Sequence, residues 1–159
     1  MQATMTLGRD PEAGIRGVLS FLLGHTEPQA GPATPAYYRP GACNIGPAEI
    51  ARRRRTGHLG VMLAVAIFVV LVALDVPPLV RFLVALPAAV AATGYLQAWL
   101  RFCVGFAALG VFNFGPLGGE QRIDDPVARA RDRARAVRLT VAAALLGAAV
   151  GVVVVLLPL

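Results

Sequence analysis

The sequence contains no lysine and few charged residues of any kind. All fifteen basic residues are arginine, and charged residues make up 15% of the 159, against about 25% in soluble domains. With 57% hydrophobic residues, this composition is typical of a membrane protein. The net charge of +6 would also suit a nucleic-acid-binding protein. The arginines lie beside apolar runs, however, so we expect lipid contact and no nucleic-acid partner.

Several chemical signatures are absent as well. Two cysteines are too few for a disulfide framework. No phosphate-binding loop, nucleotide fingerprint, Ser/His/Asp set or pair of catalytic carboxylates can be assembled. No charged residue lies in the middle of an apolar run, which argues against a proton or ion pathway. We therefore expect a protein without enzymatic activity, without a cofactor and without a metal site.

Three long apolar runs are present instead. They predict an all-α membrane protein with transmembrane helices at about residues 56–75, 79–100 and 138–157. At 1.5 Å per residue, about 20 residues extend about 30 Å, which is the thickness of the hydrocarbon layer. The apolar part of residues 101–112 is too short to cross, so an interfacial or partly re-entrant segment is expected there.

The chain before the first run is punctuated by proline and glycine. Residues 1–42 are therefore predicted to be a disordered N-terminal region, and residues 43–159 a helical membrane domain. Pro47 suits the first position of a helix, and Glu49 would lie in its first turn, four residues before Arg53. Asp125 is the predicted N-cap of the last helix, with Pro126 at its first position.

Small residues recur at helical spacing in two runs. Ala143, Gly147 and Gly151 form one stripe in the last run, which we interpret as a helix-packing face. An alanine- and glycine-rich composition also produces such stripes by chance. A second face of small residues lies in the middle run, which Pro87 is expected to kink: Ala85, Ala88, Ala89 and Ala92.

Arginine placement predicts the orientation. Four consecutive arginines precede the first run, and seven lie between the second and third runs, at residues 101–138. The positive-inside rule then places the N-terminus and the 101–138 segment in the cytoplasm and the C-terminus outside, in a bacterial inner membrane. The four are predicted to contact anionic lipid head groups or another anion: Arg52, Arg53, Arg54 and Arg55.

Two polar motifs flank the first hairpin of apolar runs, NIGPAEIARRRRTG at 44–57 and CVGFAALGVFN at 103–113. Together they resemble the YgaP-like inner-membrane domain, a two-helix family of unknown function, over about residues 43–113. The departures are Glu49 for an aspartate, Ile50 for the first arginine and Val104 for a proline. The residues in register are Asn44, Gly46, Glu49, Arg53, Gly57, Cys103, Phe106, Gly110 and Asn113.

What the resemblance implies is limited. Such domains often occur alone or beside a rhodanese domain, which handles sulfane sulfur. No rhodanese loop is present in this sequence, so sulfurtransfer chemistry is not carried over. Cys103 is the position at which the family pattern and reactive chemistry meet.

The candidate thiols, Cys43 and Cys103, allow a second interpretation. Neighbouring arginines favour the thiolate, which is the nucleophilic form of cysteine. With His58 the two thiols make three soft ligands, whereas zinc usually takes four. Both cysteines being small buried hydrophobes is the simpler alternative.

The sequence thus predicts an accessory membrane module that packs with itself or with a membrane partner through glycine and alanine faces. The alternative is a thiol-dependent sulfur or redox protein that uses Cys103, with Cys43, beside an arginine anion site. A small anion-conducting oligomer is a weaker hypothesis, because the apolar runs supply no polar lining.

Overall fold

The computed structural model describes residues 38–158, and most of them are helical. The disorder predicted for residues 1–37 therefore lies outside the described residues. The elements in chain order are α2 (Pro47–Ala73), the 3-10 helix η1 (Pro78–Val84), α3 (Ala85–Trp99), α4 (Val104–Leu109), β1 (Val111–Phe112), β2 (Gln121–Arg122) and α5 (Pro126–Leu156).

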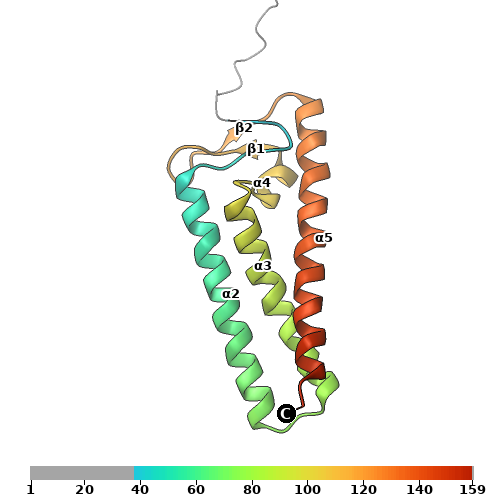
Figure 1. Cartoon of the computed structure of the whole chain (residues 1–159). Coiled ribbons are helices and arrows are strands. Elements are labelled where there is room, and N and C mark those ends of the chain that lie inside the picture. Colours follow the sequence, from blue (N-terminus) through green and yellow to red (C-terminus); the bar gives the residue numbers. More distant parts are fainter. Residues whose placement is uncertain (1–37, 159) are drawn as a thin grey trace, which may run out of the picture. The chain divides into compact units, whose positions relative to one another are not determined.

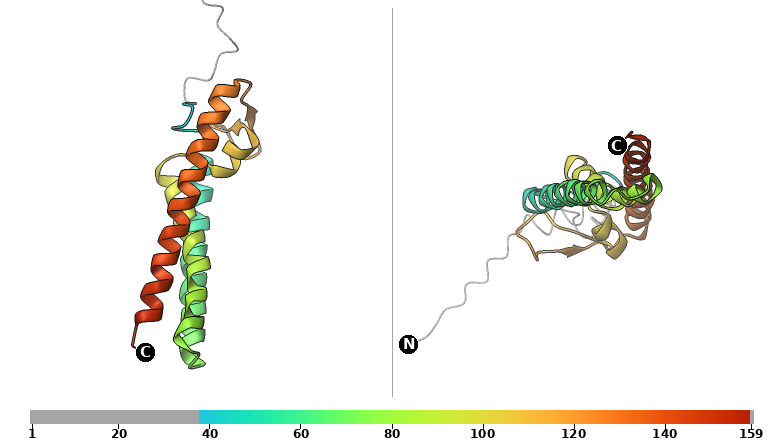
Figure 2. Two further views of the ribbon diagram at one scale, coloured as in Figure 1. Left: turned by 90° about the vertical axis from the view of Figure 1, so that its right-hand side faces the viewer. Right: turned by 90° about the horizontal axis from the view of Figure 1, so that it is seen from below.

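Three helical stretches are long and apolar enough to cross a membrane, which confirms the predicted fold class. They are α2, the continuous η1–α3 stretch Pro78–Trp99, and α5. Helix α3 lies between α2 and α5 and contacts both (Figures 1 and 2). Because α2 and α5 run in one direction and α3 in the other, α2 and α5 begin at the same end. We call this the arginine-rich end, and it also carries α4 and the β1–β2 hairpin (Figure 1).

The predicted helix starts are confirmed. Pro47 is the first residue of α2, and the Asp125 carboxylate accepts a hydrogen bond from the Val127 N–H at 2.8 Å at the start of α5. The middle span begins as the 3-10 helix η1, and regular α-helix starts at Ala85, two residues before Pro87. Pro87 lies in the first turn of α3, and the kink predicted there stays a prediction.

Glycine allows the spanning helices to approach closely. A Cβ atom built on Gly60 would lie 2.6 Å from the Ala91 nitrogen, and one on Gly94 2.5 Å from the Gly57 nitrogen, so α2 and α3 touch backbone to backbone. On the other side of α3, a Cβ on Gly147 would lie 2.5 Å from the Ala89 Cβ. Lipid offers no hydrophobic drive for helix association, so close packing of small residues holds such helices together.

The two predicted small-residue faces therefore meet each other within this chain. Gly147 contacts Ala85 and Ala89 of α3, and Gly151 contacts Ala85 and Phe82. Ala143 is buried one turn earlier on the same face of α5. The stripe on α5 is thus covered by the middle span of the same molecule.

Outside the spans, the chain folds into a small polar cap at the arginine-rich end. The hairpin pairs Val111 with Arg122 and Phe112 with Gln121 in antiparallel register, and Ile45 bridges to Asn113. Helix α4 packs on α5, so residues 104–109 stay beside the helix ends. Residues 38–42, predicted to be disordered, already belong to this cap, because Tyr38 is buried against Phe112 at a ring-centroid distance of 4.9 Å.

Candidate functional site

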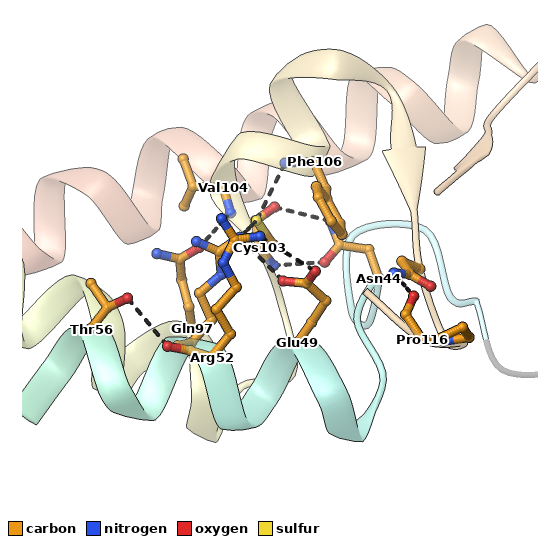
Figure 3. A network of polar contacts seen from close by, with 11 residues as sticks. Asn44, Glu49, Arg52, Thr56, Gln97, Cys103, Val104, Phe106 and Pro116 are labelled. Atoms are coloured by element: carbon orange, nitrogen blue, oxygen red, sulfur yellow. Dashed lines mark hydrogen bonds and ion pairs between the residues drawn. The ribbon is translucent and has the colours of Figure 1, made fainter. Parts of the chain in front are cut away.

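The most distinctive part of the molecule is a buried polar cluster in the cap, drawn in Figure 3. Its bonds converge on Cys103, and Asn44, which is fully buried, supplies two of them. Its amide nitrogen donates to the Cys103 carbonyl at 3.0 Å, and its amide oxygen accepts from the Cys103 N–H at 2.6 Å. The Asn44 side chain therefore joins the segment before α2 to the start of α4, 59 residues later, by saturating two backbone groups.

Cys103 is the N-cap of α4, and its sulfur is enclosed. The residue is 1% exposed. Its Sγ accepts hydrogen bonds from the Phe106 N–H at 3.4 Å and from Arg53 Nη2 at 3.0 Å. Sulfur here replaces the side-chain oxygen usual at an N-cap. Any reaction at this thiol requires the cap to open.

Glu49 supplies the buried charge of the cluster. It is 0% exposed, and its carboxylate lies 3.5 Å from Arg53 Nη2 and 3.7 Å from Arg52 Nη1. The predicted pairing of Glu49 with Arg53 is confirmed. Neither carboxylate oxygen has a hydrogen-bond partner among the described residues, nor has Arg53 Nε. Its partners among the described residues are the two arginines, which makes the buried Glu49 carboxylate sensitive to their loss.

The four consecutive arginines do not act together. An α-helix turns about 100° per residue, so consecutive side chains point in different directions. Arg53 turns inward, with a 20% exposed side chain that also lies over the Phe106 ring at 6.0 Å. Arg52 is 58% exposed at its side chain, and Arg54 and Arg55 are exposed. The exposed side chains of Arg52, Arg54 and Arg55 can therefore reach a lipid head group or another anion, as predicted for all four arginines.

A second buried carboxylate, that of Asp132 in α5, anchors the start of the described chain. It is 0% exposed and accepts hydrogen bonds from the Tyr38 hydroxyl at 2.9 Å and from the Gly41 N–H. Arg135, one turn on, donates to the Gly41 carbonyl at 2.8 Å. Burial, and then the bond to Asp132, raise the pKa of Tyr38 above its ordinary value.

Sequence reasoning did not single out Asp132 or Gln97. Gln97 Oε1 accepts from the Val104 N–H at 2.9 Å and so fixes α4 to the end of α3. The sequence context of Asp132 could have indicated a buried role. Asp132 is the one carboxylate within the arginine-rich start of a helix that continues into an apolar run. Gln97 carried none, because one amide near the end of an apolar helix is unremarkable.

The side chains of Cys43 and His58 make other contacts than those of the buried cluster. Cys43 is partly exposed, and both cysteines are free thiols. His58 Nδ1 lies 2.7 Å from the Tyr95 hydroxyl. Within residues 38–158, no group of three or more His, Cys, Asp or Glu side chains is placed to hold a metal ion.

Comparison with family models, with curated proteins and with solved structures finds no match. The resemblance to the YgaP-like domain therefore stays a prediction. Seven of the nine residues that carry it nevertheless gather in one region, whereas Gly57 lies against Tyr95 of α3 and Gly110 against Arg129 of α5. Asn44, Glu49, Arg53, Cys103 and Phe106 are linked by the contacts above, and the Gly46 N–H donates to the Asn113 carbonyl at 2.7 Å. A Cβ on Gly46 would lie 2.7 Å from the Phe114 Cα, so only glycine fits there.

Proposed function

We propose that this protein is a non-enzymatic accessory module of the bacterial inner membrane. Its arginine-rich end would lie at the cytoplasmic head-group layer and its C-terminus outside. One observation carries the proposal. The buried polar side chains of Asn44, Gln97 and Asp132 form hydrogen bonds with backbone groups of the cap. Side chains engaged in this way hold a fold together and are not available to a substrate.

The partner would be lipid, a second copy or another membrane protein. The glycine and alanine faces support close packing, but they are in contact within the chain. An intermolecular contact would therefore use the outer faces of the helices, where large apolar side chains such as Leu59, Met62 and Leu145 are exposed. The family resemblance adds no activity to this proposal.

The rival function is thiol chemistry at Cys103, with Cys43 as the second thiol. One observation favours it, namely the 3.0 Å approach of Arg53 Nη2 to the Cys103 sulfur. A guanidinium at that distance stabilises a thiolate. The enclosure of the sulfur argues the other way, because a thiol must be reached before it can react.

Cysteine labelling in sealed membrane vesicles of known orientation separates the two functions. Cys43→Ser and Cys103→Ser each leave a single thiol, which is treated with a membrane-impermeant or a permeant maleimide. The accessory proposal expects the impermeant reagent to label Cys43 from the cytoplasmic face, and Cys103 to stay unlabelled until the protein is denatured. Rapid labelling of Cys103 in the native state would favour the thiol function instead. Labelling of Cys43 from the outer face would overturn the proposed orientation.

A further inference from the structure

Beside the polar cluster, a separate cavity opens between the start of α2 and the end of α3. It has a volume of about 1340 Å³, larger than the roughly 300–1,000 Å³ of most small-molecule pockets. A second cavity of about 570 Å³ adjoins it along the helices, and the two share Arg54, His58 and Trp99. The two cavities thus form one continuous groove.

The part of the groove nearest the arginine-rich end is lined by positively charged side chains and, among the described residues, by no carboxylate. The charged side chains of its lining are those of four arginines, Arg39, Arg54, Arg55 and Arg101, and His58 is a further polar side chain there. Among residues 38–158, the two ion pairs to Glu49 involve Arg52 and Arg53, which lie outside the groove. The guanidinium groups that line the groove have no such carboxylate, so their field favours an anion.

The backbone around Arg101 fixes where this arginine stands. Its φ angle is 52°, in the left-handed region that glycine adopts more easily than other residues. The Arg101 carbonyl accepts the Asn44 and Ile45 N–H groups at 3.1 and 3.4 Å, and these bonds hold the conformation in place. Arg101 directly follows the C-cap of α3, and Asp75, which directly follows the C-cap of α2, has a similar φ angle of 48°, so this conformation ends both helices. At the end of α3 it leaves the Arg101 side chain in the lining of the groove.

Farther from the arginine-rich end, the groove is lined by apolar and aromatic side chains. Tyr95, Leu96 and Trp99 line it, and Trp99 is 79% exposed. Beyond His58, the surface of α2 continues with the exposed side chains of Leu59 and Met62. A soluble anion would use the arginines alone, whereas an anionic amphiphile would use both parts of the groove.

We propose that this groove binds an anionic phospholipid. The phosphate of the head group would lie among Arg54, Arg55 and Arg101, and an acyl chain would follow Tyr95 and Trp99 along the α2–α3 face. Arginine forks match phosphate oxygens, and indole side chains suit the boundary between head groups and acyl chains. The inference rests on the proposed location of this end of the bundle at the head-group layer.

Trp99 provides the measurement, because it is the single tryptophan in the chain. The full chain is reconstituted into phosphatidylcholine vesicles to which one lipid with brominated acyl chains is added. This lipid is either phosphatidylglycerol or phosphatidylcholine, and the quenching of Trp99 fluorescence is recorded as its mole fraction rises. We expect half-maximal quenching at a mole fraction of brominated phosphatidylglycerol about tenfold lower than that of brominated phosphatidylcholine, since each arginine near the head group adds a several-fold preference.

Two variants of equal charge test whether the site is specific. Arg55→Gln with Arg101→Gly removes two guanidinium groups from the groove, and glycine relieves the backbone at position 101. Arg133→Gln with Arg138→Gln removes two exposed arginines of α5 that do not line the groove. The groove variant should lose most of the preference for phosphatidylglycerol, whereas the α5 variant should keep it.

The contrary outcomes are distinct. Equal quenching by the two lipids overturns the lipid site, and equal loss in both variants reduces it to general surface charge. Suppression of the preference by millimolar inorganic phosphate would assign the groove to a soluble anion. Absence of quenching by either lipid would overturn the proposed location of this end in the membrane as well.

Discussion

The apolar bundle and the polar cap are stabilised in opposite ways. In the bundle, α2, α3 and α5 touch through glycine and alanine, and their large apolar side chains point outward. In the cap, the large and polar side chains are inside, and Phe102, Asn44, Glu49 and Asp132 are all 0% exposed. The difference follows from the surroundings. Lipid leaves apolar surface exposed without penalty, whereas the irregular backbone of the cap needs partners for its N–H and carbonyl groups.

The bundle should be broken most severely by filling a glycine contact. Gly60→Leu introduces a side chain where a Cβ atom already lies 2.6 Å from the Ala91 nitrogen, a backbone atom that cannot move aside. We expect a loss of about 3 kcal/mol or more, with separation of α2 from α3. Thermal unfolding in detergent micelles measures it. Ala149→Leu on the exposed face of α5 is the control, and an equal loss there would show that bulk rather than contact is responsible.

In the cap, the largest effect is expected from the buried charge. Glu49→Gln leaves the Arg53 guanidinium enclosed without a counterion, at a cost of about 3 kcal/mol. The double variant Glu49→Leu with Arg53→Leu removes both charges and should recover much of the loss. Chemical denaturation of the parent protein, the single variant and the double variant gives their free energies of unfolding, which are then compared. Exposed Glu120→Gln serves as the control, and a Glu49→Gln protein as stable as this control would contradict the role assigned to the pair.

A smaller effect is expected from Asn44→Ala. This change leaves the buried N–H of Cys103 unpaired and removes one of the two hydrogen bonds that the Cys103 carbonyl accepts, which costs about 2 kcal/mol. Hydrogen exchange should rise at residues 103–107 and stay unchanged in the middle of α3. Thr56→Ala, which removes an exposed bond within one helix, should change little. Uniform exchange across both regions would mean that the bundle and the cap unfold as one unit.

The smallest expected effect is a pH dependence confined to the cap. Because the pKa of folded Tyr38 lies above its ordinary value of 10.0, the unfolded chain releases this proton first as the pH rises. The contribution of Tyr38 to stability is therefore complete below pH 10 and declines above it. The difference in melting temperature between the parent protein and Tyr38→Phe, measured on both sides of that pH, should be constant below it and shrink above it. A difference that stays constant throughout would contradict the buried bond to Asp132.

Much of the bundle was predictable from the sequence, because its determinants are local. A run of apolar residues, a proline at the first position and an aspartate cap act on neighbouring residues, and the helices that begin at Pro47 and Pro126 were found in this way. Pairing of Glu49 with Arg53 was predictable for the same reason, since four residues bring two side chains together on any helix.

The cap was less predictable, because its contacts join residues far apart in the chain. Asp132 binds Tyr38 across 94 residues, and Asn44 binds Cys103 across 59. Nothing near Tyr38 in the sequence indicates that residues 38–42 are held by a helix near the other end of the chain.

The sequence by itself determined the three apolar helices, their approximate limits and the concentration of arginine at one end, since length and hydropathy alone decide these. Tertiary structure decided which arginine faces inward, because the approach of Cys103 and Phe106 to one side of α2 selects Arg53. It also decided that the glycine stripe of α5 is covered within the chain, and that Arg54, Arg55 and Arg101 share one groove. Each of these depends on which surfaces meet, and that follows only from the packing of the whole chain.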